Sequence, residues 1–166
     1  MLVAVSITFS YKRMSKSGFT PLFSQKDIDQ WVDIFTEMAD EKMYTLLQAA
    51  GEMFVKYARE SGRYIDHTGN LRSSIGYVIV RNGSVAYSDF RKQNVGTEGA
   101  EGVEKAKRLA RELAATHNDG LVLIGLAGME YAVYVEAIES KDVITGANIQ
   151  TEEWMRTAIK TVFERA

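Results

Sequence analysis

The sequence reads SQKDIDQWVDIFTEMADEKMYTLLQAAGEMFVKYARESG from Ser24 to Gly62, and this stretch decides the fold. Its apolar residues recur at intervals of three and four, which is typical of a helix with one buried stripe. They are Ile28, Trp31, Val32, Phe35, Met38, Ala39, Met43, Leu46, Leu47, Ala50, Met53, Phe54, Tyr57 and Ala58. Ser24 and Asp27 form a capping-box start, and Gly62 is a typical helix stop. We therefore predict one long helix here.

The length of this helix raises a question about packing. Unbroken, it would be about 57 Å long at a rise of 1.5 Å per residue. A compact domain of this size has a radius of gyration of only about 15 Å. The helix therefore either bends near Gly51 or carries one end beyond its own domain, where a partner must cover it. The first alternative is an ordinary kinked core helix, and the second indicates an assembly protein.

The composition is that of a globular protein, with 46% hydrophobic and 25% charged residues. A net charge of −2 gives no global field that would draw the chain to nucleic acid or to an anionic membrane. Cysteine is absent from the sequence, which excludes disulfides, thiol catalysis and cysteine-bound metal. No apolar run approaches the ~20 residues that cross a bilayer.

The organisation that we expect is an N-terminal arm over residues 1–23 and a single domain over residues 24–166. Within the arm, residues 2–9 alternate like a strand, and the rest is polar and basic. Met14 offers an alternative translation start, which would leave residues 1–13 outside the native product. Protection of residues 1–13 in a limited digest would contradict that hypothesis.

A β-hairpin is predicted after the long helix. Residues 77–81 and 84–88 are apolar segments that flank Asn82-Gly83, the signature of a two-residue type I′ turn. This register places Val80 opposite Val85 and Val78 opposite Tyr87. We expect the face made by these four side chains to lie on the long helix.

The remaining elements complete an α+β fold. A second helix is predicted over about residues 101–117, a central strand over residues 121–126, and a last helix over residues 151–165 with Trp154 facing inward. Residues 131–136 are ambiguous between strand and helical turn. The sum is a long N-terminal helix and two shorter helices packed on one face of a small, mostly antiparallel β-sheet.

Catalytic and metal-binding motifs are missing from the sequence. His67 and His117 lie fifty positions apart and belong to no H-E-x-x-H pair. A triad of His67 with Asp66 and a serine at 73 or 74 would join residues too close in sequence to point at one another. There is no G-x-S-x-G elbow and no phosphate-binding glycine loop. We predict no enzyme, metal or cofactor, although a small hydrolase with a site around His67 and Glu136 stays open as an alternative.

One helix side is a candidate contact for nucleic acid. It carries the basic residues Lys105, Lys107, Arg108 and Arg111. Interspersed glutamates at 101, 104 and 112 instead favour ion pairs between neighbouring turns of a solvated helix. A DNA-contacting module that uses this basic side is the second functional hypothesis, and salt-dependent binding to duplex DNA would support it.

Two segments resemble a known family. Thr68-Gly69-Asn70-Leu71-Arg72-Ser73-Ser74-Ile75 is similar to the T-G-x-L-R-x-S-I element of the HK97-type tail-component family of tailed bacteriophages, the gene-product-ten-like proteins. Tyr131-Ala132-Val133-Tyr134-Val135-Glu136 is similar to the Y-A-x-Y-V-E element that comes later in that family. The order of elements also matches, and the resemblance covers roughly residues 26–165. The chain departs from the family where Ala137-Ile138-Glu139-Ser140 replaces an aromatic followed by Gly-Thr.

The resemblance implies a non-catalytic virion structural protein that forms a ring in the neck, at the junction of head and tail, or completes the tail for joining. Its partners would be copies of itself and other phage neck or tail proteins, with no membrane and no small-molecule substrate. It would be assembled in the cytoplasm of a bacterial host and end in the virion. A ring needs head-to-tail interfaces between identical subunits.

The same resemblance gives the candidate site residues. They are Leu71, Arg72, Ser74, Tyr131, Tyr134 and Glu136. We expect Leu71 and Tyr131 to anchor two short turns on the core, with Thr68 capping the first turn. We also expect Arg72 and Glu136 to form a buried or interfacial ion pair.

Overall fold

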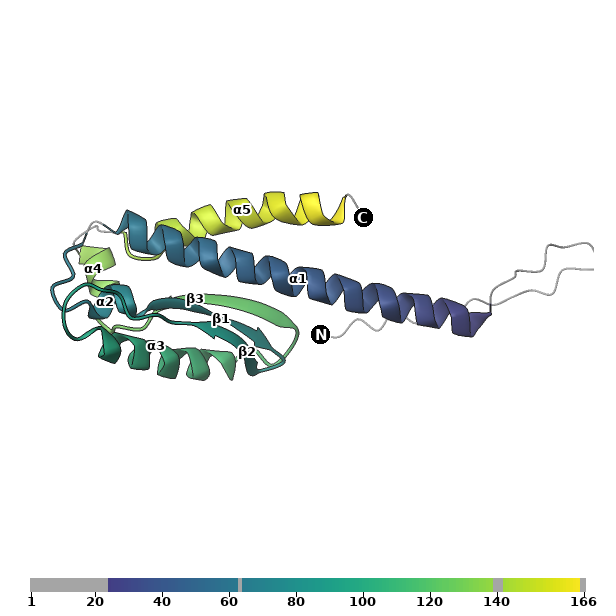
Figure 1. Ribbon diagram of the computed structural model, residues 1–166, viewed down its shortest axis with the longest axis horizontal. Helices are drawn as coiled ribbons and strands as arrows, with labels where there is room; N and C mark the ends of the chain where they lie inside the picture. The colour runs from purple at the N-terminus through teal and green to yellow at the C-terminus, as the bar shows by residue number, and fades with distance from the viewer. Residues whose placement is uncertain (1–23, 63, 139–141, 165–166) are drawn as a thin grey trace, which may run out of the picture. The chain divides into compact units, whose positions relative to one another are not determined.

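The structure is a computed structural model that describes residues 24–62, 64–138 and 142–164 (Figure 1). The predicted arm, residues 1–23, lies outside the described residues. In chain order the elements are α1 (Gln25–Ser61), α2 (Asn70–Ser73), β1 (Ile75–Arg81), β2 (Ser84–Asp89), α3 (Gly99–Ala114), β3 (Leu121–Ala127), α4 (Ala132–Ile138) and α5 (Thr145–Phe163). This confirms the predicted α+β class. The chain divides into two units between Glu37 and Met38, and the packing described below is that of the second.

The start of α1 is fixed by the predicted capping box. The Ser24 amide donates to Asp27 Oδ2 at 2.7 Å, and the Asp27 amide donates to Ser24 Oγ at 3.3 Å. Hydrogen bonds from the Ser24 amide and hydroxyl lower the pKa of the Asp27 carboxyl, because they favour its charged form. The helix then runs without interruption to Ser61.

Gly51 lies within α1 and permits a close approach between the helix and the sheet. A Cβ atom at Gly51 would lie 2.2 Å from the ring of Tyr77 on β1. The Tyr77 side chain is 1% exposed, and its hydroxyl donates to Glu52 Oε1 at 3.1 Å. Gly51 is therefore explained by its close packing against Tyr77, and α1 continues through it as a helix.

The sheet has three antiparallel strands in the order β2-β1-β3. The prediction that residues 121–126 form the central strand is wrong, because β1 is central and β3 lies at an edge. An edge strand can also be a continuous apolar run when helices cover both faces of the sheet, so the apolar run did not reveal the position.

The hairpin turn is confirmed, with positive φ at both Asn82 and Gly83. Val80 pairs with Val85 as predicted, but Tyr87 pairs with Ile79 and not with Val78. A β-bulge between Ile79 and Val80 shifts the register, and a bulge moves every later side chain of the ladder.

Helices cover both faces of the sheet, not one face as predicted (Figure 1). On one side Tyr77 and Ile79 pack in a core cluster with Phe54 and other residues of α1. On the other side Val78 and Val80 pack with the alanines of α3. The expectation that Val78 and Val80 face the long helix is therefore wrong. Because β1 is buried on both faces, alternation of apolar residues did not tell which face meets which helix.

The C-terminal part is helical. Residues 131–136, which were ambiguous, lie mostly in α4. The last helix, α5, begins at Thr145 and not at the predicted Thr151. Glu136 Oε1 accepts the Thr145 amide at 2.8 Å, and Asp142 Oδ1 accepts the Gly146 amide at 2.9 Å. Within the described chain, no helix has the length and apolarity needed to span a membrane.

Candidate functional site

The first motif segment, residues 68–75, is held by a carboxylate that precedes it. Asp66 Oδ1 accepts the Gly69 amide at 2.9 Å, and Asp66 Oδ2 accepts the Arg72 amide at 2.7 Å. The Thr68 hydroxyl accepts the Asn70 amide at a longer distance of 3.3 Å. Asp66 therefore supplies most of the capping that we expected from Thr68, because a carboxylate can accept from two amides at once.

Two glycines allow the backbone of the motif segment to pack directly against the backbone of the loop over residues 90–98. Gly69 has φ 78°, and a Cβ atom there would lie 1.6 Å from the carbonyl oxygen of Val95. Gly96 has φ 67°, and a Cβ atom there would lie 2.2 Å from the carbonyl carbon of Thr68. Both the left-handed backbone and the close approach require glycine at these positions.

Asn70 joins the motif to the start of α3. Its side-chain oxygen accepts the Gly102 amide at 3.1 Å, and its side-chain nitrogen donates to Glu98 Oε2 at 3.5 Å. The Glu98 amide donates to the Thr68 carbonyl at 3.0 Å. Asn70 is 5% exposed, so these bonds satisfy a buried polar side chain.

The two serines of the motif also make structural bonds. Ser73 Oγ accepts the Gln93 amide at 3.0 Å, which fastens the loop over residues 90–98. The Ser74 hydroxyl donates to the Leu71 carbonyl at 2.8 Å, and the Ser74 carbonyl accepts the Gly128 amide at 3.1 Å. Both serines are 0% exposed. The motif is thus a junction that ties α2, α3 and the end of β3 together.

Arg72 caps the C-terminus of α1. Its guanidinium donates to the carbonyl of Arg59 and to that of Gly62, the latter at 3.0 Å, and it lies 4.9 Å from the centre of the Tyr64 ring. Cations are favoured at this end of a helix, where carbonyl groups lack partners. Within the subunit, Arg72 and Glu136 therefore have different partners, so the expected buried ion pair is not formed there, and the interfacial alternative stays a prediction. Glu136 instead binds the first amide of α5, so each charged group meets a helix end of opposite polarity.

The two anchors predicted by the motifs lie in one cavity. Leu71 and Tyr131 both line a cavity of about 420 Å³, together with Tyr64, His67 and Val135. Leu71 is 2% exposed, whereas Tyr131 is 40% exposed. Partial burial raises the pKa of the Tyr131 hydroxyl, and the nearby Asp66 carboxylate adds to this effect. Leu71 is therefore a core residue, and Tyr131 is an exposed neighbour of the same junction.

Tyr134 presents most of its side chain to solvent, with 60% exposed, and Val133 is 74% exposed. Both belong to α4, whose Ala132 is buried in the same core cluster as Leu71. The second motif therefore fixes α4 through a small residue and leaves larger apolar side chains outside.

The basic side of α3 is largely neutralised. Lys105 Nζ lies 3.1 Å from Glu101, Lys107 Nζ lies 3.6 Å from Glu104, and Arg108 Nε lies 4.0 Å from Glu112. These distances confirm the expected pairing between neighbouring turns. The side chain of Arg111 lines a small cavity with Phe90 and Lys107. Contact with DNA through this side stays the second hypothesis, which these ion pairs make less favourable.

The histidines are far from forming a common centre. His67 lines the cavity beside Tyr131, while His117 Nδ1 lies 2.9 Å from the Leu113 carbonyl at the end of α3. Among residues 24–62, 64–138 and 142–164, no group of three or more acidic or histidine side chains is placed to hold a metal ion.

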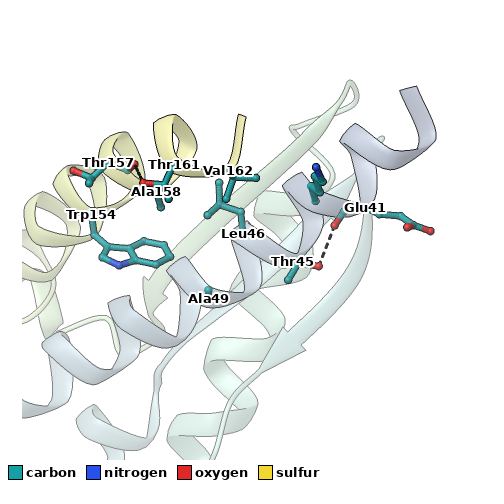
Figure 2. A pocket seen from close by; sticks show the side chains of 10 residues that line it. Glu41, Thr45, Leu46, Ala49, Trp154, Thr157, Ala158, Thr161 and Val162 are labelled. Carbon is teal, nitrogen blue, oxygen red and sulfur yellow. Dashed lines mark hydrogen bonds between the residues drawn. The ribbon is translucent and has the colours of Figure 1, made fainter. Parts of the chain in front are cut away.

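A groove between α1 and α5 was missed by sequence reasoning (Figure 2). It has a volume of about 690 Å³, and its walls are mostly alanine, threonine, leucine and valine, with one tryptophan. The lining residues are Glu41, Lys42, Thr45, Leu46 and Ala49 of α1, and Trp154, Thr157, Ala158, Thr161 and Val162 of α5. Trp154, which we predict to face inward, is only half-buried, as is Val162. The small residues that recur on both helices were the one sequence feature that could have predicted the groove.

Comparison with known protein families places most of the chain in one of them. The model of a protein family described as "Bacteriophage HK97-gp10, putative tail-component" matches residues 26–137. The matched range contains both motif segments and stops before α5, earlier than the expected residue 165. No curated protein and no solved structure matches the chain.

Proposed function

The chain belongs to the HK97-gp10-like family of bacteriophage tail components, and from this membership we propose that it is a ring-forming structural protein of the phage neck. In this role it joins head to tail, or completes the tail so that joining can follow. A tail component is associated with the virion and works in contact with other phage proteins. The family match over residues 26–137 is the observation that carries the proposal, because it spans α1 through most of α4.

The chemistry of the first motif supports a non-catalytic role. The side chains of Asn70, Arg72 and Ser73 bond to backbone groups of neighbouring segments, and that of Ser74 bonds to the Leu71 carbonyl within the motif. Side chains that act as nucleophile or base must line a site that a substrate can reach, whereas Ser73 and Ser74 are fully buried. The motif is thus better suited to holding a rigid subunit than to a reaction.

The candidate residues separate into two roles within this proposal. Leu71, Arg72, Ser74 and Glu136 position the backbone, as their burial and hydrogen bonds indicate. Tyr131 and Tyr134 are the members with exposed side chains, and we propose that they contact a neighbouring subunit or another neck protein. Exposed aromatic residues are enriched in such contacts.

The test is a deletion of the gene from the phage or prophage genome that carries it. We expect filled heads and separate tails to accumulate, and joined particles to return when the intact gene is supplied in trans. A Tyr134→Ala variant should complement less well than the wild type. The control is Val85→Ala, which changes an exposed apolar side chain on a different element, β2, and should complement normally. Joined particles in normal yield from the deletion strain would refute the proposal.

A further inference from the structure

The groove between α1 and α5 is shaped to receive large side chains. Most of its lining residues are small, among them Ala49 on one wall and Ala158 on the facing wall (Figure 2). Thr45 and Ala49 are themselves exposed, and Trp154 closes the groove only partly. Its volume of about 690 Å³ lies within the range of about 300–1,000 Å³ that is found for sites that bury a ligand.

The same chain carries an apolar ridge on the first turns of α1. The ridge consists of Trp31, Val32, Phe35 and Met38, which share one face of the helix and are 53–69% exposed. At about 150–250 Å² for each fully exposed large side chain, the ridge presents roughly 500 Å² of apolar surface. This approaches the roughly 800 Å² per partner of a standard interface and is near the upper limit for patches on monomers.

The spacing of the ridge continues along α1 into the groove wall. Trp31, Phe35 and Met38 are followed by Lys42, Thr45 and Ala49, at alternating intervals of four and three residues. This is the 3.5-residue repeat by which one helix packs along another, with side chains of one helix inserted between those of its partner. The side chains are large in the first half of the repeat and mostly small in the second half, so one half complements the other.

The occupant that fits is a second copy of the chain. The ridge and one groove wall belong to the same uninterrupted helix, and a continuous helix does not fold back on its own face. Two identical chains, however, can place the ridge of one in the groove of the other. A contact between two different surfaces of identical subunits is head-to-tail, and it forms a ring when the rotation between successive subunits closes.

We propose that the groove between α1 and α5 binds the ridge at the start of α1 from a second copy of this chain. This inference rests on the proposed function and names the surfaces through which neighbouring subunits of the ring meet. Phe35 and Met38 of one subunit lie between the small residues around Ala49 and Ala158 of the next.

The test uses the absence of cysteine from the sequence, since each introduced thiol is then the only one in its chain. Affinity-tagged full-length chains with Phe35→Cys are mixed at high concentration with untagged chains that carry Ala158→Cys, and disulfide formation is followed by mass. The matched control replaces Phe35→Cys with Asp33→Cys, on the opposite side of α1. We expect the Phe35–Ala158 pair to cross-link between chains at least tenfold faster than the control pair.

Equal rates for the two pairs, or cross-links only between two Phe35→Cys chains, would overturn the inference. A groove-filling variant, Ala158→Trp, gives a second readout. It should weaken self-association in light scattering at least tenfold with an unchanged circular dichroism spectrum, and unchanged association would also overturn the inference. If the chain associates through other surfaces, the groove contact fails while the role in head–tail joining stands, because the deletion test decides that role separately.

Discussion

Replacing Arg72 by alanine should lower the free energy of unfolding by about 2–3 kcal/mol. The guanidinium donates to two carbonyls at the end of α1 and lies over the ring of Tyr64. Hydrogen bonds from a charged donor contribute about 1.5–3 kcal/mol each when buried, and a cation–π contact about 0.5–1 kcal/mol. Arg72 is only half-buried, so water can reach part of the site and reduce the sum. In a domain of this size the change lowers Tm by roughly 5–10 °C.

Urea denaturation followed by circular dichroism measures this change. Arg156→Ala is the matched control, because Arg156 is exposed and pairs with Glu152 at 2.6 Å on one face of α5. An exposed pair of this kind contributes less than about 0.5 kcal/mol. Arg72→Lys should recover part of the loss, because lysine keeps the charge near the carbonyls but lacks the planar fork.

A double-mutant cycle with Glu136→Ala tests the assignment of partners. Arg72 and Glu136 each cap a different helix, so their effects should add within about 0.5 kcal/mol. A coupling energy above about 1 kcal/mol would show that the two side chains interact after all. A loss below about 0.5 kcal/mol for Arg72→Ala would refute the capping role itself.

Three further outcomes are expected. Gly69→Ala should destabilise the chain by at least about 3 kcal/mol, because the left-handed backbone at Gly69 and the nearby carbonyl of Val95 both disfavour a side chain. Gly120→Ala is the control: Gly120 has a similar positive φ but lies in open space, so the change should cost only about 1–2 kcal/mol. Burial raises the pKa of Tyr64 to about 12 from 10.0, so the stability linked to this hydroxyl is present below pH 10 and is lost as pH rises through 12. Tyr64→Phe should therefore unfold less readily than the wild type between pH 10 and 12, and equal alkaline sensitivity would contradict this. Finally, we expect no salt-dependent binding to duplex DNA at about 50 mM salt, because carboxylates neutralise most of the basic side of α3; saturable binding that weakens with salt would revive that hypothesis.

Local signals predicted the elements whose chemistry lies within a few residues. The Ser24–Asp27 capping box and the Asn82-Gly83 turn are both present as expected. Each depends on one backbone conformation and one short-range hydrogen bond, so tertiary packing has little opportunity to override it. The long α1 helix follows from its sustained apolar repeat for the same reason.

Predictions that depended on long-range contacts failed in identifiable ways. The bulge beside Val80 depends on how β2 pairs with β1, and the residues of the Asn82-Gly83 turn do not predict it. The early start of α5 depends on Glu136 and Asp142, which lie outside the helix that they cap. Opposite charges alone do not identify the partners of Arg72 and Glu136 within the subunit, because the partial charges at helix ends can be located only when the helix boundaries are known.

The sequence singled out the two motif segments but did not predict the contacts of their residues. Leu71 and Tyr131, which we expect to anchor two turns on the core, line one cavity, and Tyr131 is 40% exposed. The sequence did not show that Asp66 would do the capping, since a carboxylate before a glycine is common in loops. The groove was missed because a half-buried helix such as α5 has the same apolar periodicity as a buried one.

The close contact between the backbones at Gly69 and Gly96 holds the loop over residues 90–98 in place. It contains no helix or strand, yet its backbone passes against the first motif and is fastened by Ser73 and Thr68. A protease that selects extended, easily displaced segments would therefore find a poor substrate here. Irregular segments are usually easy to cleave, but we expect this one to resist proteases because its backbone is fastened to the first motif.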